Sequence, residues 1–361
     1  MDRRSFIRGA GIAAAATLAA PAIAQQRPTG ELTLLTPFPP GTTGPAFSAR
    51  RIAERLRHLF AADAAVNITV HHAGEFVPAM DEFAAVADGR ATFYYGPDYY
   101  YAALHPAMNF FTSVPIGMTA IEHTAWIEQA GGQALWDELA LGLGVKPFLA
   151  GNSGMQMGGW FRRPLTSVAD IEGLRFRMPG LGGEVWRRLG AVVSNEGPAA
   201  IVAALENGTL DGADWIGPWD DMRLGLHRVA SHYYHPGLLE AGPALTLGVS
   251  KAFWDGLGDA DREAIAAAAR SENSLVLSEF HFNNATALRE LRTVDTVSIE
   301  RFPDDVIAAM ARVAPEVAEA AAVDDIGQRI HDSYFAALDL LRGWSELSEG
   351  ELVTTRARIL G

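Results

Sequence analysis

Acidic and aromatic side chains crowd into one short stretch of the chain, residues 210–221, which reads LDGADWIGPWDD. Carboxylates this close to tryptophans, in a segment broken by Gly and Pro, form either a solvated loop or the wall of a site that handles charge. Within the stretch, Asp214 directly precedes Trp215. If the tryptophan faces a cleft, the neighbouring carboxylate needs a cation or an arginine as its partner, because an unpaired charge is costly to remove from water.

The two aspartates at the end of this stretch have a different interpretation. Asp220 and Asp221 follow Gly217 and Pro218, and a helical pattern covers residues 222–230. Aspartate is favoured at the start of a helix because its side chain accepts hydrogen bonds from the first backbone N–H groups, which have no partners within the helix. We therefore expect this pair to cap the following helix.

Side chains that suit a hard cation occur at two other places. Gln156 and Glu240 lie in turns rich in Gly or Pro, and hard cations prefer carboxylate, amide and backbone carbonyl oxygens. Sequence spacing alone does not bring these residues to Asp214. His232 and His235 have the H-x-x-H spacing of some metal sites, but a lone pair of this kind is more typical of a loop than of zinc coordination.

An arginine that could bind a carboxylate lies near the end of a predicted strand over residues 174–178. Arg177 shares one face of that strand with Arg175, because side chains alternate along a strand with a period of two. It comes just before Pro179 and a cluster of glycines, so its planar fork could meet a carboxylate bidentately while the glycines let a ligand approach the backbone. A surface strand with two solvated arginines fits the same periodicity.

Signatures of common enzymes are absent from the sequence. It has no G-x-S-x-G elbow, no P-loop, no H-E-x-x-H and no G-x-G-x-x-G after a strand. Ser153 lies in a Gly-rich segment without a recognisable base, and His71 and His72 point to opposite faces of a predicted strand. A secreted metal-dependent lyase or hydrolase that uses Asp214 and Glu240 is the alternative, but the sequence offers no titratable base for turnover.

The first residues, MDRRSFIRGAGIAAAATLAAPAIAQ, predict an export signal over 1–24, because arginines precede an apolar run that ends in an A-x-A cleavage pattern. The pair Arg3-Arg4 is typical of the twin-arginine route, so we expect the protein in a periplasm. The chain has no cysteine and therefore no disulfide. Its formal charge is −14, and loss of a leader carrying +2 leaves −16. Such a charge argues against nucleic acid or an anionic membrane as a partner.

Strands and helices alternate along the chain after the leader, which indicates an α/β fold with βαβ units and a mostly parallel sheet. The length of 361 residues predicts two domains, and a ligand cleft is expected between them. An uninterrupted helical pattern over 259–292 is expected to connect the two lobes. The expected parts are lobe I at 25–150 and 242–275, lobe II at 151–241 and 276–324, and a C-terminal helical segment at 325–361.

Four segments together resemble a known family: GNSGMQMGGWF (151–161), ADIEGLRFRMPGLGGEVWRRLGA (169–191), AALENGTLDGADWIGP (203–218) and HPGLLEAGP (235–243). They are similar to the solute-binding subunits of TRAP transporters, the tripartite ATP-independent periplasmic transporters, and most similar to the branch that captures 2-oxo acids such as pyruvate. The resemblance runs over nearly the whole chain after the leader. It implies a two-lobed, type II-like periplasmic binding protein that closes on a small carboxylate and delivers it to a membrane permease, without enzyme activity.

The resemblance also implies roles for individual residues. It makes Arg177 the clamp for the substrate carboxylate. It implies that a metal cation, Na⁺ or Ca²⁺, bridges to the bound acid and is held by Gln156, Asp214, Glu240 and the backbone of Trp215. The branch often has glutamate before this tryptophan, whereas Asp214 is one methylene shorter. The shorter side chain could move the cation, change the preference between Na⁺ and Ca²⁺, or leave room for water.

Two further expectations concern the pocket wall and the C-terminus. Tyr100, Trp160 and Asn152 are expected to contact the substrate. The segment 325–361 carries an apolar helical stripe beyond what two lobes need, so it packs across its own lobes or, as in the oxo-acid branch, mediates a homodimer. Another interpretation keeps the binding fold but makes the protein the ligand-sensing partner of a signalling receptor.

Overall fold

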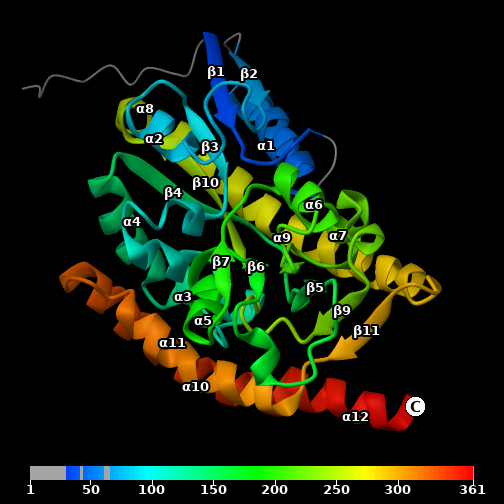
Figure 1. Ribbon diagram of the computed structural model, residues 1–361. Helices are drawn as coiled ribbons and strands as arrows, with labels where there is room; N and C mark the ends of the chain where they lie inside the picture. The colour runs from blue at the N-terminus through cyan, green and yellow to red at the C-terminus, as the bar shows by residue number, and fades with distance from the viewer. Residues whose placement is uncertain (1–29, 41–43, 61–65, 361) are drawn as a thin grey trace, which may run out of the picture.

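Two β-sheets, each covered by helices, make up the body of the protein and confirm the predicted two-lobed α/β fold (Figure 1). The computed structural model describes residues 30–40, 44–60 and 66–360. The predicted export signal over 1–24 lies outside this part of the chain. Among the described residues, no helix combines the length and the apolar composition that crossing a bilayer requires.

The first sheet has the strand order β2-β1-β3-β10-β4. Its strands are β1 (Gly30–Leu35), β2 (Val66–His71), β3 (Phe93–Gly96), β4 (Val145–Asn152) and β10 (Ala244–Ser250). β1 pairs in parallel with β2 and β3, whereas β10 runs antiparallel between β3 and β4. Every residue of β10 is buried, as expected for a strand covered on both faces. The helices that pack against this sheet include α1 (Gly44–Phe60), α2 (Glu82–Ala87), α3 (Ala120–Gln129), α4 (Gly132–Gly142) and α8 (Lys251–Gly256).

The second sheet has the order β11-β9-β5-β8-β6-β7. Its strands are β5 (Gly159–Phe161), β6 (Arg175–Arg177), β7 (Val192–Ser194), β8 (Gly212–Ala213), β9 (His232–His235) and β11 (Ser298–Arg301). β6 is parallel to both of its neighbours, while β5 is antiparallel to β8 and β9. Both sheets are therefore mixed, which corrects the expectation of a mostly parallel sheet. Helices α5 (Gly180–Arg188), α6 (Pro198–Glu206) and α7 (Pro218–Leu224) belong to the same half of the chain.

The two sheets are joined at three places. The chain passes between them after β4 and again after β9, and α9 (Asp259–Leu291) forms the third connection (Figure 1). This helix is 33 residues long and packs against β4, α1 and α7, so it touches elements of both halves. The lobe boundaries themselves stay a prediction.

The C-terminal segment runs along one edge of the molecule as a succession of helices (Figure 1). It consists of α10 (Asp304–Ala320), α11 (Asp325–Ser345), a π-helical turn (Glu346–Gly350) and α12 (Glu351–Leu360). The Tyr334 hydroxyl of α11 accepts a hydrogen bond from the backbone N–H of Met118 at 2.7 Å, which ties the helix to the first lobe. α12, in contrast, contains no buried residue.

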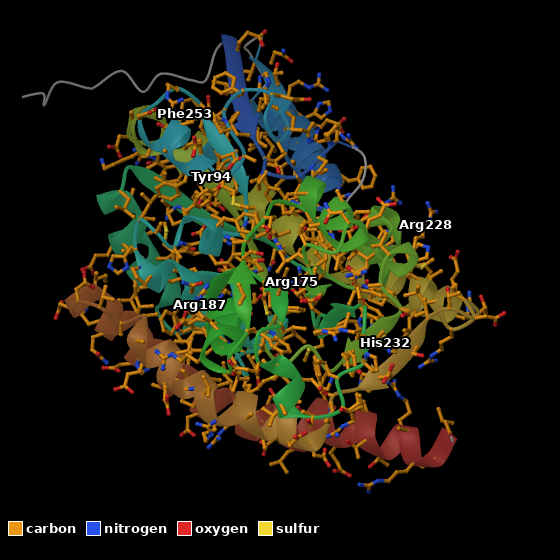
Figure 2. The ribbon with its side chains drawn as sticks, viewed as in Figure 1. Tyr94, Arg175, Arg187, Arg228, His232 and Phe253 are labelled. Atoms are coloured by element: carbon orange, nitrogen blue, oxygen red, sulfur yellow. The ribbon has the colours of Figure 1, made fainter. Side chains whose placement is uncertain are left out.

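Two local predictions are wrong. A single helix over 222–230 is not present, because α7 ends at Leu224 and a short 3₁₀ turn (Leu226–Arg228) follows a left-handed Gly225. The segment His232–His235 is a strand rather than a loop, and its two tyrosines are buried. His232, labelled in Figure 2, bonds to Glu300 on the neighbouring strand, with Nδ1 at 2.7 Å from the carboxylate.

Candidate ligand-binding site

Arg177 is the charged residue around which the site is built. It ends β6, in the interior of the second sheet, and its side chain is 1% exposed. Arg175, two residues earlier, has a side chain that is 45% exposed and pairs with Asp211 at 2.7 Å (Figure 2). The interpretation of two solvated arginines is therefore wrong for Arg177, since only the first of the pair lies at the surface.

The guanidinium of Arg177 is held by backbone oxygens on one side and has a free donor on the other. Nε donates to the carbonyl of Glu196 at 3.0 Å, and one terminal nitrogen donates to the carbonyl of Asp214 at 2.8 Å. The second terminal nitrogen, Nη2, is buried and has no hydrogen-bond partner. The Cζ atom of the guanidinium lies 5.4 Å from the centre of the Trp215 ring, and Nε1 of that ring also lacks a partner. Both free N–H donors suit an anion such as a carboxylate.

Three buried acceptors without partners complement these donors. They are Oε1 of Gln156, Oδ2 of Asp214 and Oε2 of Glu240. The backbone N–H of Gln156 donates to the carbonyl of Glu240 at 3.3 Å, so the two connecting segments lie side by side. Buried polar atoms are normally paired, because leaving one unpaired costs about 1–3 kcal/mol.

The donor set fits a hard cation. Among the residues that the structure describes, no cluster of three or more His, Asp or Glu side chains could hold a metal ion by itself. A cation here would therefore also need the amide oxygen of Gln156 and backbone carbonyls. Two carboxylates, one amide oxygen and nearby backbone carbonyls suit Na⁺ or Ca²⁺, whereas zinc prefers His and Cys.

The two carboxyl groups also perturb each other. Burial raises the pKa of Glu240 to about 8, and the neighbouring Arg177 opposes the rise. Burial, and next the charge of Glu240, raise the pKa of Asp214 well above its ordinary value. Arg177 balances only one of the two carboxylates, and a bound monocarboxylate would add another negative charge. A cation among these groups would favour their charged forms.

A small cavity lies beside Arg177, Gln156 and Trp215. Four predicted residues, Gln156, Arg177, Trp215 and Tyr100, contribute to its wall. Several other residues of the wall were not predicted from the sequence, among them Phe38, Pro45, Pro97, Pro243 and Leu245. Phe38 follows the C-terminal end of the parallel strand β1, a place where α/β proteins commonly bind ligands, and this position is the signal that could have identified it.

Trp160 does not occupy the predicted position in the pocket wall. Its side chain is fully buried, stacks on Tyr233 with ring centroids 4.0 Å apart, and donates from Nε1 to Asp221 at 2.9 Å. Its only polar atom is therefore already used. Asp221 also accepts from the backbone N–H of Gly217, just before α7, so it stabilises the turn into that helix from within its first turn rather than capping a helix at 222.

Asn152 has a structural role in the segments that connect the sheets, and it is not among the residues that line the cavity. Its amide donates to the carbonyl of Gly242 at 2.8 Å and its Oδ1 accepts from the backbone N–H of Gly154 at the same distance. Both polar atoms are thus occupied, and the side chain is fully buried. Asn152 therefore ties the connecting segment after β4 to the connecting segment before β10. Gln156 lies in the first of these segments and Glu240 in the second.

A cavity between two α/β lobes, lined by a buried arginine with an unpaired N–H and a glutamine with an unpaired oxygen, is typical of a protein that binds a small ligand. The chain matches the family described as bacterial extracellular solute-binding protein, family 7, over residues 51–324, and it belongs to this family. It is 33% identical over 311 residues to the monocarboxylate 2-oxoacid-binding periplasmic protein of Nostoc sp. strain PCC 7120, covering 86% of this chain and 85% of that protein. The protein is therefore a periplasmic TRAP solute-binding protein and not an enzyme.

Solved structures of TRAP solute-binding proteins have the same fold. One from Bordetella bronchiseptica, a dimer with calcium and picolinate bound, is 30% identical with a TM-score of 0.88, covering 92% of this chain and 98% of that one. One from Pseudoalteromonas atlantica, with sodium and pyruvate, is 29% identical with a TM-score of 0.86 and coverages of 91% and 99%. One from Colwellia psychrerythraea, with calcium and pyruvate, is 27% identical with a TM-score of 0.86 and coverages of 91% and 100%.

Proposed function

We propose that this protein captures a small monocarboxylate, a 2-oxo acid such as pyruvate, and delivers it to the membrane permease of a TRAP transporter. Arg177 clamps the carboxylate, and a cation bridges the acid to the protein. The observation that carries the proposal is the buried set of unpaired groups: Arg177, Trp215 and Gln156 line one cavity, and the carboxyls of Asp214 and Glu240 lie close enough to Arg177 to interact with its charge. A carboxylate satisfies the donors, and a cation satisfies the acceptors.

The chemistry of a 2-oxo acid matches this combination. Its carboxylate and the adjacent carbonyl oxygen lie close enough to bind one cation together, while a carboxylate oxygen still accepts from an arginine. Gln156, Asp214, Glu240 and the backbone carbonyl of Trp215 would hold the ion. The ion supplies positive charge at the point where ligand and protein carboxylates approach each other.

The cavity supports a ligand with a short chain. The space open to the centre of a water molecule is only about 20 Å³, so the walls of the cavity lie close together and leave no room for a long chain. Apart from Arg177, Gln156 and Ser153, its walls are mainly aromatic, aliphatic or prolyl, and they include Phe38 and Tyr99. Such walls favour a short aliphatic or aromatic substituent and disfavour a second carboxylate, which would have no cationic partner there.

Export and delivery follow from the same proposal. The arginine pair near the N-terminus directs the chain along the twin-arginine route to the periplasm. There, ligand binding shifts the equilibrium between open and closed lobes, and the permease recognises the closed form.

Thermal unfolding of metal-stripped protein, with the leader removed, tests the proposal. We expect the melting temperature to rise with pyruvate or a longer 2-oxo monocarboxylate in the presence of Na⁺ or Ca²⁺, and to rise much less without the cation. At about 100 times its Kd, a ligand adds about 2.7 kcal/mol of stability. Lactate and dicarboxylates serve as comparison ligands. No shift with any 2-oxo acid, with or without cation, would overturn the proposal.

We also propose that the C-terminal segment mediates a homodimer. Its exposed apolar side chains include Leu340, Trp344 and Leu347, with exposed fractions of 77%, 72% and 80%. α12 has no buried residue and packs mainly against the turn that precedes it. A helix with this much uncovered apolar surface is typical of a protein interface.

Negative charges introduced into this apolar surface are expected to separate the subunits. The double variant Trp344→Glu with Leu347→Glu should elute as a monomer in size-exclusion chromatography with light scattering, because two charges would be buried without partners. The control is Leu104→Glu, which introduces a charge at a leucine that is 51% exposed and lies outside the C-terminal segment. This variant should stay dimeric. A wild-type protein that is monomeric at micromolar concentration would show that the segment covers only its own lobes.

A further inference from the structure

One contact joins the two lobes next to the ligand cavity without using any ligand-binding group. The carboxyl of Asp220, in α7 of the second lobe, accepts from the backbone N–H of Gly44, which opens α1 in the first lobe. The distances are 2.8 Å to Oδ1 and 3.1 Å to Oδ2, and Asp220 is fully buried. The first N–H groups of a helix have no partner within it, so a residue 176 positions away supplies the cap.

The backbone at Gly44 lies directly against aromatic rings at this contact. A Cβ atom on Gly44 would lie 2.8 Å from the ring of Trp219 and 3.0 Å from the ring of Phe280, both closer than carbon atoms normally approach. These two rings pack edge to face with centroids 5.2 Å apart, and the backbone N–H of Trp219 is fixed by Asn284 of α9 at 3.0 Å. Glycine at position 44 therefore lets the start of α1 approach α7 and α9 as closely as it does.

The contact adjoins the ligand cavity but stays outside it. Pro45, the residue after Gly44, lines the cavity together with Ile216, two residues before the start of α7. Asp220 itself does not contribute to the wall. A change at Asp220 or Gly44 can therefore alter how the lobes meet without removing a ligand contact.

We infer that the hydrogen bond between Asp220 and Gly44 is a latch that forms only when the lobes are closed and that strengthens ligand binding by stabilising the closed form. The inference rests on the proposed function, in which the lobes close on the ligand. When the lobes separate, water can solvate both groups. The bond therefore contributes to the free-energy difference between the open and closed forms. Asp220 is thus a positioning residue that acts through closure.

Two variants remove the latch in different ways. Asp220→Ala leaves the N–H of Gly44 buried and unpaired in the closed form, whereas Gly44→Ala keeps the acceptor but places a methyl group against Trp219. We expect each to weaken the affinity for the preferred 2-oxo acid about ten- to a hundredfold. In Asp220→Ala the unpaired buried donor opposes closure, and in Gly44→Ala the clash between the methyl group and the ring of Trp219 does. The loss should appear in the dissociation rate, since closure follows encounter.

Matched variants separate closure from folding. Asp220→Asn retains an oxygen that can accept from Gly44 and should restore most of the affinity. Gly256→Ala adds the same methyl group at an exposed helical glycine with open space around it and should bind like wild type. If Asp220→Ala fails to fold in urea titrations of ligand-free protein, Gly44→Ala decides the question.

Closure itself can be measured because the chain has no cysteine. Leu59→Cys on α1 and Val192→Cys on β7, which are 45% and 62% exposed, allow spin labels on opposite lobes. We expect a longer inter-label distance, or a larger open fraction, in both latch variants than in wild type. Equal affinities and equal distance distributions in all variants would overturn the latch. Failure of wild type to bind any 2-oxo acid would instead overturn the proposed function, and the distances in ligand-free protein would still test the latch.

Discussion

Replacing Arg177 with alanine is expected to abolish binding of 2-oxo acids while both lobes stay folded. The free N–H donor of this guanidinium is buried beside the cavity, so the ligand carboxylate would lose its one cationic side-chain partner among the residues lining it. Removing one member of a buried, hydrogen-bonded charge pair typically costs about 2–5 kcal/mol, which weakens binding at least about thirtyfold. Isothermal titration with pyruvate and Ca²⁺ measures the loss.

The chain can tolerate this substitution because its neighbours can adjust. Arg177 opposes the rise in the pKa of Glu240 and of Asp214, so its removal lets these carboxyls take up protons instead of staying charged and unpaired. The control is Arg175→Ala, which removes the same charge two residues earlier on β6, from a surface pair with Asp211. That variant should bind normally. Full affinity in Arg177→Ala would show that another group holds the carboxylate.

The helices of this fold could be predicted because their sequence signals are local. In α3, residues 120–129, the signal is a capping box that Thr119 and Glu122 form at the start of the helix. The strands of the second sheet are harder, since β5 has three residues and β8 has two, which is too short for an alternating pattern. β9 was mistaken for a loop because its polar residues find partners on other elements, such as Glu300 on β11.

The site shows the same division between local signals and tertiary contacts. Arg177, Gln156 and Trp215 come together in the structure as the family resemblance implies, although no spacing rule would bring them together. Trp160 and Trp215 look alike in sequence, but one indole N–H is bonded to Asp221 while the other has no partner. Only the paths of the connecting segments decide which tryptophan faces the cavity.

In metal-stripped protein, the free energy of unfolding is expected to fall as the pH rises from about 4.5 toward 8. Glu240 has an ordinary pKa of 4.5 and a folded pKa of about 8, so the folded chain holds a proton in this window that the unfolded chain has released. The free energy of unfolding then falls by at most about 1.4 kcal/mol per pH unit for that proton. Above the folded pKa the folded chain has lost the proton too, and the stabilisation that protonated Glu240 gave is gone. A cation can replace the proton, so added Ca²⁺ or Na⁺ should stabilise most near pH 8 and least near pH 4.5.

Glu240→Gln should remove most of this behaviour, because the amide neither titrates nor carries the charge that attracts the cation. Urea unfolding across this pH range, with and without Ca²⁺, should show a flatter pH profile and a much smaller gain from the ion than in wild type. The matched control is Asp211→Asn, a carboxylate close to Asp214 in sequence whose pKa is lowered by its pairing with Arg175, and which lies outside the donor set. It should keep the cation effect. If Ca²⁺ stabilises Glu240→Gln as much as wild type, the ion is held elsewhere, and the raised pKa of Glu240 then reflects burial without a bound cation to offset it.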